Sequence, residues 1–264
     1  MPEGDTIVRT ARTLARALEG REVLGFRSPL PALADASLAG RAVARVEPRG
    51  KHLLIHFDDG RVLHSHMRMT GSWHVYRPAE PWWKPERLAR AVIETADFVA
   101  VCFNAPVVEL LSAGEVARHP ALRRLGPDVL GEGFDPEGAR TRLRSMPDAP
   151  IGEALLAQGA IAGIGNIYKS EALFATRINP FSPVGQLSDA AIDRLLGAAR
   201  RLMSASVEGS GARRTRSFPG GGPRYAVYRR SGLPCLTCAT KIRIRRQGDA
   251  GRSTYWCPRC QGAD

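Results

Sequence analysis

Apolar residues near the start of the chain recur every three to four positions. The recurring positions are Ile7, Ala11, Leu14 and Leu18. Arginines occupy another face of the same run, which is the pattern of an amphipathic helix. Gly20 follows directly and suits a helix end. The pattern therefore predicts a helix over residues 6–18.

The pattern changes after this helix to short runs of apolar and β-branched residues. Asp58-Asp59-Gly60 and Thr95-Ala96-Asp97 separate neighbouring runs with residues typical of hairpin turns. We therefore expect an antiparallel β-sandwich or flattened barrel with the first helix packed on it. The seven expected strands cover residues 21–26, 41–46, 51–57, 61–67, 73–76, 91–94 and 98–103.

From about residue 113 the pattern becomes helical. Asp135-Pro136-Glu137 provides a capping residue, a proline at the first helical position and a first-turn acid, and it predicts a helix ending at Arg144 or Ser145. Ser188 is expected to cap a long helix. Further helices are expected over 151–158 and, after a glycine-rich turn at 163–166, over 167–176; residues 209–224 are expected to form a mobile linker.

The composition is that of a globular protein, and the charge is placed unevenly. Of 264 residues, 44% are hydrophobic and 24% charged, and the run of 18 apolar residues that a membrane span needs does not occur. We expect a soluble, intracellular protein. Residues 211–264 hold 12 Arg/Lys against 2 Asp/Glu, out of a formal net charge of +12. This favours a nucleic acid as partner over an acidic membrane surface or a merely solubilising tail.

Four of the five cysteines lie near the C-terminus in two pairs, Cys235-x2-Cys238 and Cys257-x2-Cys260. This spacing predicts one structural, tetrahedral Zn²⁺ site, since all four positions are protein ligands and disulfides are disfavoured inside cells. The residues between the pairs predict a β-hairpin, with Arg252 near its turn. The fifth cysteine, Cys102, falls in an expected strand and is interpreted as a core residue.

The first residues of the chain carry a candidate nucleophile. Pro2 is small enough for Met1 to be removed, which would leave a secondary amine at the chain start. An α-amino group titrates near ~8, so a useful fraction is uncharged at neutral pH. Glu3 follows directly and could transfer protons at the attacked carbon. An ordinary exposed N-terminus before a helix is the alternative on this stretch alone.

Together these features resemble one known family over the whole length of the chain. The chain is similar to the formamidopyrimidine-DNA glycosylase and endonuclease VIII family of base-excision repair enzymes, which have a helix-two-turn-helix motif. The order and spacing of the motifs carry the resemblance. They are Met1-Pro2-Glu3-Gly4, Arg49-Gly50-Lys51, Leu125-Gly126-Pro127-Asp128, Gly163-Ile164-Gly165-Asn166, and Gly251-Arg252 leading to Cys257-Pro258-Arg259-Cys260.

The resemblance implies a bifunctional DNA glycosylase and AP lyase acting through an N-terminal proline Schiff base with β,δ-elimination. By this resemblance Pro2 attacks the anomeric carbon of a flipped nucleotide and Glu3 is the proton donor. Lys51 assists β-elimination, and Arg252 is linked to δ-elimination and phosphate binding. Asn166, at a helix N-terminus, is expected to hold a phosphate beside the lesion.

The resemblance also implies DNA contacts that distinguish two branches of the family. Arg68 and Arg124 match DNA-contacting positions, and the loop Arg68-Met69-Thr70 lies where the family places its intercalating residues. Met69 is the candidate wedge, with a packed methionine as the alternative. Gly4-Asp5-Thr6 and Phe103-Asn104-Ala105-Pro106 favour the endonuclease VIII branch, and hence oxidised pyrimidines. An oxidised-purine glycosylase, and a non-catalytic zinc-ribbon DNA-binding protein, are the alternatives.

Four parts are expected along the chain. They are a catalytic β-sandwich domain (1–112), a helical helix-two-turn-helix DNA-binding domain (113–210), a flexible basic linker (211–226) and a four-cysteine zinc finger (227–264). The expected fold class is therefore α+β. We expect a monomer that binds damaged double-stranded DNA and no membrane, in the cytoplasm and associated with the nucleoid.

Overall fold

A computed structural model describes residues 2–209, 211, 213, 215 and 222–262 of the chain. The contacts within the chain divide it into two units, with the boundary in the sequence between Arg123 and Arg124. The two units are described separately. Met1, whose removal is expected, and part of the expected linker at 211–226 lie outside the described residues. The expected four-part division of the chain stays a prediction.

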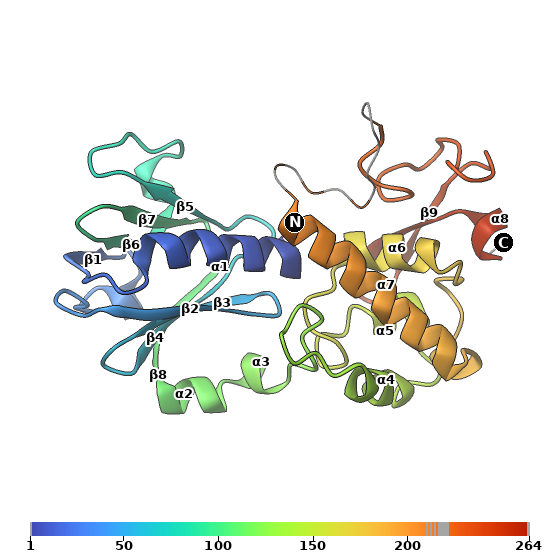
Figure 1. Ribbon diagram of the computed structural model, residues 1–264, viewed down its shortest axis with the longest axis horizontal. Helices are drawn as coiled ribbons and strands as arrows, with labels where there is room; N and C mark the ends of the chain where they lie inside the picture. Colours follow the sequence, from blue (N-terminus) through green and yellow to red (C-terminus); the bar gives the residue numbers. More distant parts are fainter. Residues whose placement is uncertain (1, 210, 212, 214, 216–221, 263–264) are drawn as a thin grey trace. The chain divides into compact units, whose positions relative to one another are not determined.

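The first unit begins with helix α1, Gly4–Leu18 (Figure 1). It starts two residues before the predicted helix because the backbone oxygen of Glu3 accepts hydrogen bonds from the amides of Thr6 at 2.9 Å and Ile7 at 3.1 Å. Gly20 adopts a left-handed φ of +73° just beyond the helix, so the expected helix end is confirmed.

Two four-stranded antiparallel sheets follow, with strand orders β1-β6-β7-β5 and β2-β3-β4-β8. The expected α+β fold with an antiparallel sandwich is confirmed, and all seven expected strands are present with shifted bounds. The strands are β1 Gly25–Arg27, β2 Val43–Arg49, β3 His52–Phe57, β4 Arg61–His66, β5 Ser72–Tyr76, β6 Ala89–Glu94, β7 Val99–Phe103 and β8 Val107–Ser112.

Strand β8 is absent from the sequence prediction. It follows a proline and carries Glu109 at its centre, so its apolar run looks too short and too interrupted to read as a strand. It pairs with β4 over six residues, from Arg61 with Ser112 to His66 with Val107. Pairing with a strand some forty residues earlier, rather than local propensity, makes this segment extended.

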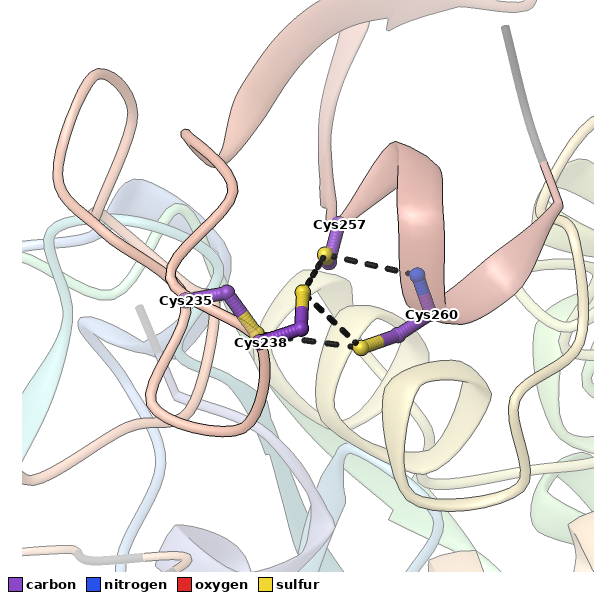
Figure 2. A group of neighbouring side chains, drawn as sticks. All are labelled: Cys235, Cys238, Cys257 and Cys260. Atoms are coloured by element: carbon purple, nitrogen blue, oxygen red, sulfur yellow. Dashed lines mark hydrogen bonds between the residues drawn. The ribbon is translucent and has the colours of Figure 1, made fainter.

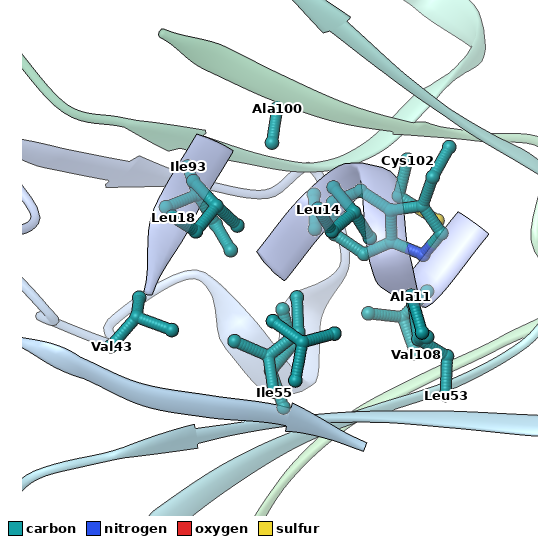
Figure 3. Packing of buried hydrophobic residues seen from close by; sticks show 14 of the residues in the cluster. Ala11, Leu14, Leu18, Val43, Leu53, Ile55, Ile93, Ala100, Cys102 and Val108 are labelled. Atoms are coloured by element: carbon teal, nitrogen blue, oxygen red, sulfur yellow. The ribbon is translucent and has the colours of Figure 1, made fainter. Parts of the chain in front are cut away.

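The core of the first unit is built from α1 and both sheets. Leu14 and Leu18 of α1 pack with Ile93 and Cys102 of one sheet and Ile55 of the other (Figure 3). The Cys102 thiol is fully buried, and this burial raises its pKa well above the usual range. Cys102 is therefore a core residue, as predicted. Helices α2, Ala113–Arg118, and α3, Pro120–Arg123, end the unit.

The second unit begins with a helical region. Helix α4, Pro136–Arg144, has the predicted bounds, and the Asp135 carboxylate accepts a hydrogen bond from the Gly138 amide at 2.9 Å. Ser188 caps α7, Asp189–Glu208, by accepting from the Ala191 amide at 3.2 Å. Helix α6 spans Asn166–Ala175. Both capping predictions are confirmed.

The helix expected over 151–158 is wrong in length, because α5 covers only Ile151–Ala154. Beyond it the backbone continues in turns, and the Gln158 side chain bonds to the glycine turn instead of lying on a helix surface. Its Oε1 accepts from the Gly163 amide at 3.1 Å and its Nε2 donates to the Ile164 carbonyl at 3.1 Å.

The unit ends in a β-hairpin formed by β9, Arg243–Gln247, and β10, Arg252–Trp256, followed by the short helix α8, Pro258–Gln261. The two strands pair antiparallel from Arg252 with Gln247 to Trp256 with Arg243. This confirms the predicted hairpin. Among the described residues, every helix is too short or too polar to cross a membrane.

Candidate functional site

Pro2 and Glu3 lie at the start of α1. Pro2 is half-buried, whereas Glu3 is fully buried and occupies the N-cap position in an extended conformation. The Glu3 side chain does not cap the helix, so the cap is made by its backbone oxygen alone. A buried carboxyl group at this place is held next to Pro2 by the backbone geometry of the helix start.

Lys51 lies in the tight turn between β2 and β3. Arg49 pairs with His52 on either side of the turn, so Gly50 and Lys51 are its two central residues. Gly50 adopts a left-handed φ of +60°, which a side chain at this position would strain. The hairpin therefore fixes the backbone from which the half-buried Lys51 side chain extends.

The predicted wedge loop follows β4. Arg68 has a φ of +44°, and Met69 is 61% exposed although it is a large apolar residue. The Thr70 hydroxyl donates to the Asn104 carbonyl at 3.1 Å, which ties the loop to the residues after β7. At Gly71 a Cβ atom would lie 2.7 Å from the Met67 backbone. The loop is therefore tightly anchored and displays Met69, so the alternative of a packed methionine is wrong.

Arg124 and Asn166 belong to the second unit. Arg124 is exposed at the start of this unit. Asn166 is the first residue of α6, after a turn in which Gly163 has a φ of +95°. Its Nδ2 donates to the Ser253 carbonyl at 2.7 Å, and its buried Oδ1 has no hydrogen-bond partner in the described part of the chain.

Helix α6 holds the hairpin strand that carries Arg252. The same Ser253 carbonyl also accepts from Lys169 Nζ at 3.2 Å, and Lys169 donates to the Thr254 hydroxyl at 2.8 Å. The structure thus brings Asn166 to the residue next to the exposed Arg252. The role of Lys169 in holding the hairpin was not predicted from the sequence. Its position three residues after Asn166, on the same helix face, is the signal that could have found it.

Glu171 is a second residue that sequence reasoning missed. Its buried carboxylate accepts hydrogen bonds from the backbone amides of Ala226, Val227 and Tyr228 at 2.8 to 2.9 Å, and from the Thr215 hydroxyl. One carboxylate therefore anchors the chain where it enters the cysteine-rich segment. No local sequence motif predicts this role, because every one of these partners lies more than forty residues from Glu171 in the sequence.

The four C-terminal cysteines gather in one cluster. Figure 2 shows their sulfur atoms pointing toward one another; Cys235 and Cys238 lie in the loop before β9, Cys257 caps α8 and Cys260 lies within it. The Cys238 sulfur lies 3.4 Å from those of Cys257 and Cys260, and the Cys235 and Cys260 sulfurs are 3.9 Å apart. Zn–S bonds of 2.3 Å in a tetrahedron separate sulfurs by about 3.8 Å. The four thiols therefore fit one Zn²⁺.

Comparison with known families identifies three matching regions. The formamidopyrimidine-DNA glycosylase N-terminal domain matches residues 1–106, and the H2TH domain of formamidopyrimidine-DNA glycosylase matches residues 125–217. A zinc finger found in that glycosylase and in IleRS matches residues 232–262. The three regions include every sequence-predicted site residue except Arg124.

Curated relatives and solved structures agree with these matches. A probable endonuclease 8 2 of Streptomyces coelicolor is 44% identical over 99% of this chain and 94% of its own length. A DNA-(apurinic or apyrimidinic site) lyase Nei2 of Mycolicibacterium smegmatis is 38% identical over the full length of both chains. The Lactococcus lactis formamidopyrimidine-DNA glycosylase bound to DNA with an AP site aligns with a TM-score of 0.81 and 25% identity, over 98% of this chain and 99% of that one.

Proposed function

The chain belongs to the formamidopyrimidine-DNA glycosylase and endonuclease VIII family, and on that premise we propose that it excises oxidised pyrimidines from duplex DNA through an imine formed by Pro2. It is a DNA glycosylase with AP lyase activity in base-excision repair. Its DNA partner, a structural zinc ion at the four cysteines and the roles of the site residues are part of this proposal.

The chemistry follows from a secondary amine beside a carboxyl group. The lone pair on the Pro2 nitrogen forms a bond to C1′ of the flipped nucleotide, while the bond from C1′ to the base breaks. The base leaves with the electron pair and takes up the proton that the Pro2 nitrogen loses. Glu3 gives a proton to the sugar ring oxygen as the ring opens to an iminium ion. The burial of Glu3 keeps water away from this proton. Pro2 and Glu3 thus act at adjacent atoms of one sugar.

The iminium ion then drives strand cleavage. Its positive charge withdraws electrons, so loss of a C2′ proton expels the 3′ phosphate in β-elimination, and loss of a C4′ proton then expels the 5′ phosphate in δ-elimination. Lys51 and Arg252 are proposed to act here, because cations stabilise the negative charge that leaves with each phosphate. The tight turn around Lys51 and the hydrogen bonds that α6 makes beside Arg252 hold the two residues on rigid supports.

The single observation that carries the pyrimidine preference is the display of Met69. Of the two loops that could supply a wedge, the one after β4 exposes Met69, whereas the one after β7 follows the fully buried Phe103 and contains the buried Ala105. One flexible apolar side chain can fill the gap left by a damaged pyrimidine, because many oxidised pyrimidines have lost planarity and stacking and flip at low cost.

We expect thymine glycol, dihydrouracil and 5-hydroxycytosine to be excised faster than 8-oxoguanine. Single-turnover rates on duplexes that differ only in the lesion measure this directly. Met69→Ala should slow excision of every lesion, because the gap is then left open, and Met146→Ala, a change in the second unit's packing, is the matched control. Faster release of 8-oxoguanine would place the protein in the purine-specific branch and overturn the proposed preference.

Arg252→Ala and Lys51→Ala should change strand cleavage in different ways. Loss of Arg252 is expected to let β-elimination products accumulate at the expense of δ-elimination products, and to reduce the slope of log affinity against log salt by about 0.9 if one phosphate contact is lost. Loss of Lys51 is expected to slow β-elimination itself.

The matched control is Arg259→Ala, which removes the same charge from the exposed surface of α8. Product ladders are read on denaturing gels, and binding is titrated at several salt concentrations. Identical ladders and identical salt slopes for the wild type and Arg252→Ala would remove Arg252 from the proposed mechanism.

A further inference from the structure

A cluster of histidines around one carboxylate lies in the first unit, away from the four cysteines. It joins His64 of β4, Glu109 of β8 and His119, the C-cap residue that follows α2. These elements are neighbours within the unit (Figure 1). His64 and Glu109 are direct cross-strand partners, and alternation along β4 and β8 places both side chains on the face of the sheet opposite the apolar core.

The distances within the cluster are short enough for the three residues to share one metal ion. Glu109 Oε2 lies 2.9 Å from His64 Nδ1 and 3.2 Å from His119 Nε2, and one ligand atom from each residue lies within 4.8 Å of the other two. Nitrogen and oxygen ligands at 2.0 to 2.1 Å from a tetrahedral Zn²⁺ are separated by about 3.3 Å. Two imidazoles and one carboxylate with a further open position form a common site for zinc and other divalent transition metals.

The surroundings of His64 suit a ligand. Its second nitrogen, Nε2, lies 2.9 Å from His52 Nδ1, so it can donate its proton in a hydrogen bond to His52. In that tautomer His64 Nδ1 carries no proton and can bind a metal ion. Burial is the main cause that lowers the pKa of His64, and it lowers the pKa of His52 to about 3. A metal ion binds the neutral form of an imidazole, and burial of both rings favours that form.

A metal-free arrangement of the same atoms also exists. In it His52 donates to His64, and both His64 and His119 donate to Glu109. This arrangement leaves His119 Nδ1 buried without a hydrogen-bond partner in the described part of the chain. Because His119 Nε2, not Nδ1, faces Glu109, this unpartnered nitrogen is the same in both arrangements, and zinc binding is what distinguishes them.

We propose that His64, Glu109 and His119 form a second metal site, which takes a divalent transition metal ion such as Zn²⁺. The site is independent of the proposed glycosylase function. The metal joins the end of α2 to two strands of the sheet. It thus fastens the junction between α2 and α3 to the sandwich, and bound metal stabilises this unit by mass action.

Zinc titration of the full chain tests the proposal. We expect two zinc equivalents per wild-type chain, one at the cysteines and one at the histidine cluster. Glu109→Gln, a change of nearly equal shape on a side chain that is 42% exposed, and His119→Asn should each weaken the second equivalent at least about 10-fold and leave the first in place. His74→Asn, a histidine of the other sheet, is the matched control and should keep both equivalents.

Two further measurements keep the outcome decisive if a variant is unstable. In histidine-selective NMR of the wild type, adding zinc should shift the ring signals of His64 and His119 and leave those of His74 unchanged. The same addition should raise the melting temperature of the wild type but not of Glu109→Gln. Binding of a single equivalent by the wild type, or a second equivalent that persists in both ligand variants, would overturn the proposal.

Discussion

Glu3→Gln is expected to reduce the rate of damaged-base excision by a factor of about 10² to 10⁴, the usual contribution of a general acid. The amide has nearly the same shape as the carboxyl group but cannot supply the proton that the opening sugar requires. Because Glu3 is buried at the N-cap, water does not replace it readily. Cleavage at a preformed abasic site should fall less, since the base has already gone and the sugar opens spontaneously.

The matched control is Asp5→Asn, which neutralises the other buried carboxyl group of the first turn. It should retain most of the excision rate at equal folded fraction, since Asp5 is not adjacent to Pro2. Single-turnover assays on a lesion-containing duplex and on an abasic duplex separate the two steps. A Glu3→Gln enzyme that excises the base at the wild-type rate would rule out Glu3 as the proton donor.

Cys257→Ser is expected to abolish zinc binding at the four-cysteine cluster and to weaken DNA binding severely. Buried apolar residues on the way to the hairpin, among them Val227 and Ile242, pack around the cysteines, so loss of the metal should unfold the segment. Unfolding removes Arg252 from its place beside α6 and disperses the positive charge of residues 211–264. Metal analysis and salt-dependent binding assays measure the two effects.

Cys102→Ala provides the control for this experiment, because it removes the fifth cysteine from the core of the first unit without touching the cluster. It should keep its zinc and its DNA affinity. A wild-type protein without zinc, or a Cys257→Ser variant that binds DNA as tightly as the wild type, would contradict the assigned role of the cluster.

Features with a local cause could be predicted from the sequence. The cap at Asp135 and the cap at Ser188 rest on residues within three positions of the atoms they bind. The zinc-type cysteine spacing and the hairpin between the cysteine pairs are similarly short-range patterns. For the same reason the start of α4 was located to the residue, and the fold class followed from the hairpin turns.

Features with a distant cause could not be predicted in this way. Strand β8 exists because it pairs with β4, and α5 is short because Gln158 bonds to a turn further along the chain. Lys169 and Glu171 gain their roles only from segments more than forty residues away. The histidine cluster likewise has a distant cause. His64 meets Glu109 because β4 pairs with β8, and it meets His119 because α2 packs against both strands.

Borohydride trapping of the enzyme on lesion-containing DNA, followed by peptide mapping, tests the central claim most directly. Reduction of the imine should link DNA to the N-terminal peptide at Pro2, in protein from which Met1 has been removed, and Pro2→Gly should leave only a weak signal because glycine also offers a free amine. Trapping that maps to a lysine, or that proceeds at full yield with Met1 still attached to Pro2, would contradict the proposed mechanism.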